Sequence, residues 1–168
     1  MKFTVSSTEL LSHLQGISRV INSKNTLQIL DNFLLDLQGN KLTMTASDIE
    51  TTMITSMEVA DVEGGGTVAV ANKLILDTLR DFSEQPLTFH IDDETLAIML
   101  TSSNGTYNLV GQNGDQYPML PTLSENVRSF TVGANVLLSG ISKTHFCMAD
   151  DELRPVMNGI LFDVSSNL

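Results

Sequence analysis

Apolar and polar positions alternate along residues 2–6, KFTVS, and this spacing predicts a β-strand. Apolar residues then recur at intervals of three and four, which predicts an amphipathic helix with Thr8 as its N-cap: Leu10, Leu11, Leu14, Ile17 and Ile21. Three β-rich runs follow, NFLLDL, KLTMTA and TTMITSMEV, with QGN and SDIE between them as turns. The first part of the chain therefore predicts the order β, α, β, β, β.

The same order begins again after the glycines at 64–66. Residues 67–70 predict a strand, and Asn72 is the expected cap of a helix that continues to about Ser83. The runs LTFHI, LAIMLTS and TYNLVGQ predict three more strands, and a shift of 54 residues superimposes the apolar positions of the two parts without a gap. We expect an α+β domain over residues 1–123, built from two βαβββ halves whose two helices are backed by antiparallel sheets.

A third start occurs near the other end of the chain. Shifting residues 2–41 by 127 positions places KFTVSSTELLSH on SFTVGANVLLSG without a gap, and it also pairs Asp36 with Asp163. We expect residues 124–128 to form a linker and residues 129–168 to begin a second copy of the domain, so that the sequence is a piece of a longer protein. Without further strands, residues 129–168 are expected to bury only part of their apolar face.

Composition sets the broad class of protein. Hydrophobic residues make up 42% of the chain and charged residues 17%, which is typical of a globular domain. The single cysteine, Cys147, cannot form an internal disulfide, and the first residues do not have the pattern of a signal peptide. No stretch approaches the roughly 20 apolar residues of a membrane span. We expect a soluble, cytoplasmic protein with no membrane partner.

The net charge of −11 argues against an anionic partner, but the charge is unevenly distributed. Residues 1–30 have a balance of +2, whereas residues 31–70 have a balance of −6. Basic residues lie on or beside the predicted helices, on the faces opposite the apolar stripes: Arg19, Lys24, Lys73, Arg80 and Lys143. Either these faces are directed at an anionic partner, or they are ordinary solvated helix surfaces; charge alone favours the second interpretation.

A search for catalytic chemistry finds no convincing site. The run EGGGTVAVANK lacks the G-K-[ST] of a phosphate-binding loop, and His13 and His90 have no partner at a zinc-site spacing. His145 and Cys147 are close in sequence, but we interpret them as a packed pair at a helix end. The sequence therefore predicts a protein that is not an enzyme and that holds no metal or cofactor.

Several stretches occur in an order that resembles one family: MKFTV, TLQILDNFLLDL, LTMTASDIETTM, TVAVANKLILDTLRDF, GDQYPMLP and HFCMADDELRPVMNGILF. Together they resemble the beta subunit family of bacterial DNA polymerase III, the replicative sliding clamps. The resemblance implies three similar domains per subunit and a head-to-tail homodimer that forms a closed ring. Helices would line the hole around double-stranded DNA, without sequence preference, and the DNA polymerase and the clamp loader would be the protein partners.

The resemblance also implies roles for individual residues. Lys24 would face DNA from the loop after the first helix, whereas Asp151 is an acidic departure in a second DNA-facing loop. Lys73, Tyr107 and Leu109 would lie at the subunit edge. Part of the rim of a pocket for partner peptides would be formed by Arg154 and Met157. An alternative from another class stays open: an α+β repeat scaffold for protein interactions with no role on DNA.

Overall fold

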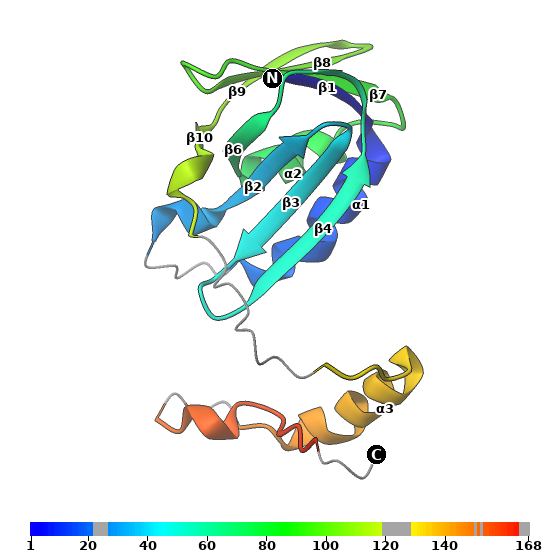
Figure 1. Cartoon of the computed structure of the whole chain (residues 1–168), viewed down its shortest axis with the longest axis vertical. Helices are drawn as coiled ribbons and strands as arrows, with labels where there is room; N and C mark the ends of the chain where they lie inside the picture. The colour runs from blue at the N-terminus through cyan, green and yellow to red at the C-terminus, as the bar shows by residue number, and fades with distance from the viewer. Residues whose placement is uncertain (22–26, 119–128, 150, 152, 165–168) are drawn as a thin grey trace. The chain divides into compact units, whose positions relative to one another are not determined.

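The computed structural model describes residues 1–21, 27–118, 129–149, 151 and 153–164. The chain divides into two compact units, Met1–Pro121 and Thr122–Leu168 (Figure 1).

The first unit contains the two predicted halves. The first half consists of β1 (Lys2–Ser6), α1 (Ser7–Ile17), β2 (Asn32–Gln38), β3 (Lys41–Ser47) and β4 (Thr52–Glu58). The second half consists of β6 (Gly66–Ala71), α2 (Asn72–Arg80), β7 (Pro86–Ile91), β8 (Ala97–Ser102) and β9 (Gly105–Val110). Short elements that the pattern did not predict add to these: β5 (Ala60–Glu63), β10 (Gln112–Asn113), and the 3₁₀ helices η1 (Ser18–Val20), η2 (Gln28–Asp31) and η3 (Gly114–Gln116). The predicted α+β fold with two βαβββ halves is confirmed.

The halves exchange their first strands. Sheet A has the order β5-β1-β7-β8-β9, so β1 of the first half joins the three later strands of the second half. Sheet B has the order β10-β6-β2-β3-β4, so β6 of the second half joins the later strands of the first. The register pairs Phe3 with Phe89 in one sheet and Phe33 with Val70 in the other, both antiparallel. Each half therefore needs the other to complete its sheet.

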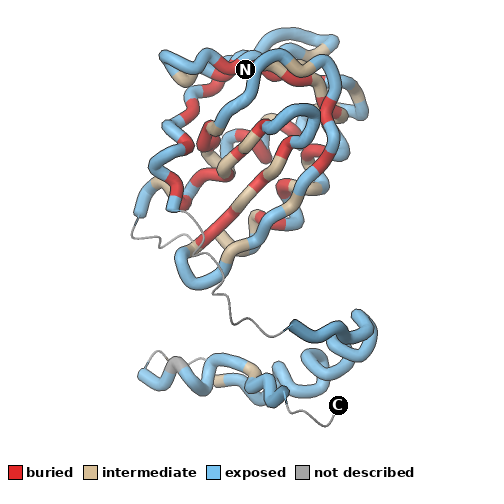
Figure 2. Tube along the Cα trace, in the orientation of Figure 1, coloured by how far each residue is buried: buried red, intermediate tan, exposed pale blue. Residues whose placement is uncertain are grey.

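The core lies between the two helices and the two sheets. Leu10 and Leu14 of α1 and Ile75 and Leu79 of α2 are fully buried in one cluster with the inward residues of both sheets. Helix α1 packs against α2, β3 and β4. In Figure 2 the buried residues alternate with exposed ones along the strands, as expected for sheets with one buried face.

The helix ends differ from the sequence-based expectation. The N-cap of α1 is Ser6, whose hydroxyl accepts a hydrogen bond from the backbone N–H of Glu9 at 3.4 Å, and Thr8 lies within the first turn. Helix α2 begins at Asn72 itself, after Ala71, and ends at Arg80 rather than near Ser83. The sequence pattern did not identify Ser6 as the cap, because Ser6 also fits the alternation of the strand at residues 2–6, which ends directly before the helix.

The second unit contains α3 (Ala134–Thr144) and the 3₁₀ helices η4 (His145–Cys147) and η5 (Pro155–Met157). The strand expected at SFTV does not form, because no described segment pairs with it as β5 and β7 pair with β1. Apolar side chains of this unit are largely exposed, such as Phe130 at 60% and Leu138 at 64%. The interpretation of His145 and Cys147 as a packed pair is wrong, since both are exposed.

Candidate nucleic-acid interface

The exposed face of α1 follows from its buried stripe. Leu10, Leu14 and Ile17 face the core, so Ser12 and Gln15 are exposed on the opposite side. Arg19 is exposed as well, but it lies in η1, just beyond the end of α1. This face offers hydroxyl and amide groups and one guanidinium group, a set that makes weak contacts with an anionic surface.

Helix α2 presents a mixed face. Lys73, Asp77 and Arg80 are exposed and recur at the spacing of one helix face, while Ile75 and Leu79 are buried. The Nη1 atom of Arg80 lies 2.7 Å from Oδ1 of Asp77, and both side chains are more than half exposed. An exposed pair of this kind contributes at most about 1 kcal/mol, so Arg80 can exchange this partner for another anion.

The other two basic residues predicted to face an anionic partner do not lie in the described part of the first unit. Lys24 lies outside the described residues. Lys143 is exposed in the last turn of α3, where a cation interacts favourably with the helix dipole, but it belongs to the second unit. Arg19, Lys73 and Arg80 therefore all belong to the first unit. They lie on or directly after α1 and α2, and these two helices pack against each other.

Acidic residues gather on the strands and hairpins of the first unit. Glu63 on β5 pairs with Lys2 at 2.5 Å, and this hydrogen bond holds the pKa of the Glu63 carboxyl below its ordinary value and raises that of Lys2. In the hairpin before β8, the backbone N–H of Thr95 donates to Asp92 at 2.7 Å and lowers the pKa of its carboxyl. These carboxylates stay ionised at neutral pH and repel other anions from the strands.

The two residues of β9 predicted at the subunit edge differ in exposure. Strand β9 is the edge of sheet A, and Tyr107 on it is 41% exposed. Leu109 is buried at 6% and belongs to the main core, so its side chain is not available at a surface. Sequence reasoning missed Phe82, whose ring meets that of Tyr107 edge to face at 5.1 Å, and Val110, which is 76% exposed. The helix expected to continue to about Ser83 had Phe82 on its apolar face, but α2 ends at Arg80 and Phe82 lies beyond it.

The predicted pocket-rim residues lie on one turn of the second unit. The backbone N–H of Met157 donates to the carbonyl of Arg154 at 2.9 Å, and both side chains are exposed. Nε of Arg154 lies 2.8 Å from Oδ2 of Asp151. The acidic departure at Asp151 is therefore balanced by a neighbouring cation, which no sequence motif had indicated.

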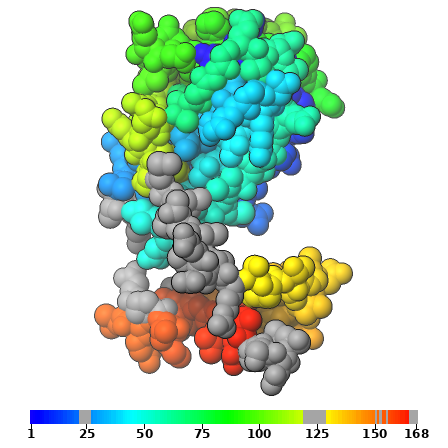
Figure 3. Space-filling view, viewed as in Figure 1, coloured from blue at the N-terminus to red at the C-terminus, as the bar shows by residue number. Residues whose placement is uncertain are grey.

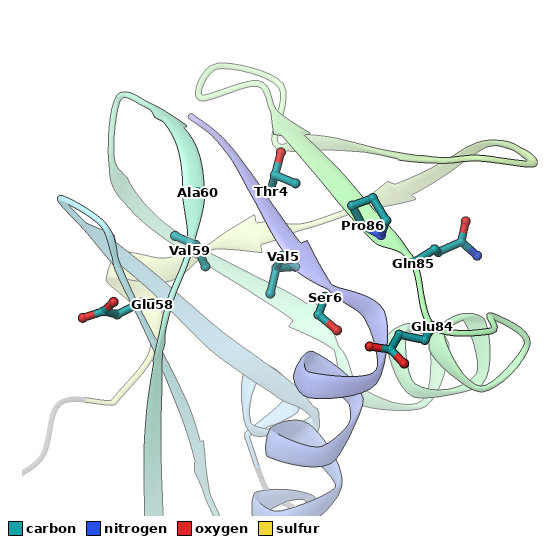
Figure 4. A pocket seen from close by; sticks show the side chains of 9 residues that line it. All are labelled: Thr4, Val5, Ser6, Glu58, Val59, Ala60, Glu84, Gln85 and Pro86. Carbon is teal, nitrogen blue, oxygen red and sulfur yellow. The ribbon is translucent and has the colours of Figure 1, made fainter.

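A hollow of about 730 Å³ lies where β1 meets α1 (Figure 4). Val5, Val59 and Pro86 line it, while the side chains of Glu58 and Gln85 extend away from it. Gln85 instead accepts hydrogen bonds from Ser103. Thr4, Ser6 and Glu84 also line the hollow, but no His, Cys, Lys or Arg is among the described residues around it. Within the described residues, no group of three or more His, Cys, Asp or Glu could hold a metal ion. No helix in the same part of the chain has the length and apolar character to cross a membrane.

Comparison with known proteins defines the class. The fold of two exchanged βαβββ halves is shared with solved structures of DNA polymerase sliding clamps. The family described as DNA polymerase III beta subunit, N-terminal domain, matches residues 1–121. The chain belongs to this family.

Curated relatives and solved structures agree with this assignment. The beta sliding clamp of Haemophilus influenzae is 30% identical over all of this chain and 45% of its own length. That of Staphylococcus epidermidis is 24% identical over 99% of this chain and 46% of its own length. The chain thus spans about half the length of the curated relatives it matches.

Among solved structures, a sliding clamp from Bartonella birtlesii aligns with a TM-score of 0.90 at 24% identity, over 99% of this chain and 44% of that one. The DNA polymerase sliding clamp from Caulobacter crescentus aligns with a TM-score of 0.85 at 23% identity, over 95% of this chain and 43% of that one. These structures share the fold of this chain.

Proposed function

We propose that this chain is part of a sliding clamp that encircles double-stranded DNA without sequence preference and tethers the replicative DNA polymerase to its template. One observation carries the proposal: in a member of this family, the exposed cations Arg19, Lys73 and Arg80 lie on or beside the adjoining helices α1 and α2. Lys24 and Lys143 would extend this DNA-facing set. The alternative of a scaffold without a DNA role has no such support.

Weak contacts suit this function. Each phosphate contact adds to affinity and to its salt dependence, so many strong contacts would slow sliding. The Asp77 carboxylate lowers the net positive charge of the exposed α2 face. Among the described residues of α1 and η1, Arg19 is the only Lys or Arg. A ring holds DNA by its topology, so a face with few cations is sufficient.

We further propose an arrangement of domains in the parent protein. Residues 1–123 form one complete clamp domain, residues 124–128 a linker, and residues 129–168 the start of a second domain. Two subunits associate head to tail through the edge that includes Tyr107 and the start of α2 at Lys73. Leu109 supports this edge from within the core. The exposed apolar residues of the second unit agree with a domain that further strands cover.

The protein partners would be the DNA polymerase and the clamp loader, and Arg154 and Met157 would contribute to the rim of a pocket for their peptides. The protein would act in the cytoplasm and carry out no bond chemistry of its own, with no cofactor. Polymerase activity would belong to the subunit that the ring retains on DNA.

The test uses the full-length parent protein with a clamp loader and polymerase on singly primed circular DNA. We expect long products with the parent protein and shorter products when Arg19, Lys73 and Arg80 are together replaced by Glu. Replacing three exposed polar residues that lie off α1, α2 and β9 by Glu, at Gln38, Ser56 and Thr101, is the control. If addition of the parent protein leaves the product length unchanged, the result contradicts the proposal and favours the protein-interaction scaffold.

A further inference from the structure

A groove crosses the face of sheet B that is turned away from the helices. One of the two adjoining hollows that form it has a volume of about 440 Å³. Leu34, Tyr117 and Pro118 supply its apolar lining, and Thr45 and Thr67 supply hydroxyl groups. Figure 3 views the first unit with this sheet in front, where the yellow-green segment that ends at Pro118 lies beside the strands.

Strand alternation explains why an apolar hollow exists on an otherwise polar face. Phe33 and Leu35 point into the main core, which leaves Leu34 on the outer side, where it packs on a second small cluster that includes Tyr117. The hydroxyl of Tyr117 donates to the backbone carbonyl of Asn32 at 3.4 Å, which fixes the ring as one wall.

The other wall depends on a glycine. A Cβ atom at Gly114 would lie 2.6 Å from the Cβ atom of Thr67, so only glycine lets η3 approach β6 this closely. The wall formed by η3 is therefore built into the fold, and the groove does not depend on a chance side-chain arrangement.

A second hollow of about 430 Å³ adjoins the first: Thr67 and Asp115 line both, and the second also includes Asp93 and Glu94. Asp36 adds a carboxylate to the first hollow. No Lys, Arg or His is among the described residues that line either hollow. The first hollow thus has an apolar floor, and only negative side-chain charges lie along the described residues of both hollows, which disfavours anionic ligands.

We propose that this groove binds an extended peptide segment of another protein, in which a leucine-sized side chain fills the hollow over Leu34 and a neighbouring Arg or Lys faces Asp36 and Asp115. Burial of the apolar side chain supplies affinity, and the charges fix the register of the segment. The groove lies on the opposite face of sheet B from α1 and α2, so a bound peptide leaves the proposed DNA-facing helices free.

The experiment measures fluorescence anisotropy of a fluorescein-labelled peptide, Gly-Leu-Leu-Arg-Arg-Gly, with the 168-residue chain at low salt. We expect saturable binding that weakens about five- to 25-fold when Asp36 and Asp115 are both replaced by Asn, since each exposed ion pair contributes up to about fivefold in affinity. The matched control, Asp77→Asn with Asp81→Asn, removes two exposed carboxylates of the α2 region and should leave binding unchanged. Peptides with Ser for Leu, or Glu for Arg, should bind more weakly.

Amide chemical shifts locate the peptide. We expect changes at Thr67, Asp115 and Tyr117 and none along α1. Absence of saturable binding, equal loss in both double variants, or shift changes confined to α3 would each overturn the proposal. Concentration-dependent self-association that is abolished by Asp36→Asn with Asp115→Asn, without peptide binding, would overturn it in favour of a second copy of the chain as occupant.

Discussion

The rings of Phe3 and Phe89 stack with their centroids 4.9 Å apart and their planes 8° from parallel. Phe3 lies on the strand that opens the first half, and Phe89 lies on the strand that follows the helix of the second half. Because both rings are fully buried, this contact joins the two halves through the centre of the core.

Loss of this ring contact should lower the urea concentration at which the first unit unfolds. Phe89→Ala removes a fully buried ring and should lower the free energy of unfolding by about 3–5 kcal/mol. Urea unfolding followed by circular dichroism measures the change. Met99→Ala on neighbouring β8, where the side chain is 41% exposed, is the control and should cost far less. Equal losses would contradict the assignment of Phe89 to the shared core.

The cap of α1 gives a second test. Ser6→Ala removes the hydroxyl that accepts from the Glu9 N–H and should cost about 1 kcal/mol of unfolding free energy. Thr8→Ala removes a hydroxyl inside the first turn and should cost less. The reverse order in urea unfolding would place the helix start at Thr8, where the sequence pattern had put it.

Acid should weaken the hairpin at Asp92. Its pKa is lowered in the folded state, first by the Thr95 backbone N–H, so the unfolded chain takes up the proton at a higher pH than the folded chain does. The contribution of Asp92 to stability is therefore complete above its unfolded pKa and is lost as the pH falls through its folded pKa. The free energy of unfolding, measured against pH, should fall less steeply in acid for Asp92→Asn. Identical slopes for both proteins would refute this assignment.

Release of Arg80 should strengthen DNA binding. Asp77→Asn removes the carboxylate 2.7 Å from the Arg80 guanidinium, so affinity for a labelled duplex at low salt should rise about two- to fivefold. Asp61→Asn makes the same change in net charge on β5 and should have a smaller effect. Lys73→Ala should reduce the slope of log affinity against log salt by about 1. A larger gain from Asp61→Asn than from Asp77→Asn would argue against α2 as the contacting face.

The edge of sheet A should govern subunit association. Tyr107→Lys places a charge on the exposed edge strand β9 and should shift the full-length parent protein from dimer to monomer in analytical ultracentrifugation. Met99→Lys is a matched control, since both side chains are 41% exposed and β8 is an inner strand of the same sheet. Dissociation by Met99→Lys alone would contradict the proposed edge.

Periodicity predicted the fold because each element has one buried face. Two local signals predicted buried faces: the helical stripe of Leu10, Leu14 and Ile17, and the strand alternation around Phe33 and Leu35. All five side chains are buried in the structure. The exchange of β1 and β6 between sheets is a pairing over long sequence distances, so no local pattern encodes it. The two-residue strand β10 is too short to show alternation.

The candidate site was only partly predictable. Exposed cations on or beside the two helices follow from the helix wheel, and Arg19, Lys73 and Arg80 are found exposed. Leu109 was expected at the edge together with Tyr107; both lie on the edge strand β9, but the Leu109 side chain is buried in the core while Tyr107 stays exposed. The pairing of Asp151 with Arg154 depends on a tight turn that the sequence does not reveal.

Site-specific crosslinking tests most directly whether the helix face meets DNA. A photoreactive side chain is placed at Gln15 on α1 in one sample and at Thr43 on β3 in another, in the full-length parent protein loaded on nicked circular DNA. We expect crosslinks to DNA from position 15 and none above background from position 43. Crosslinks from position 43, with none from position 15, would contradict it.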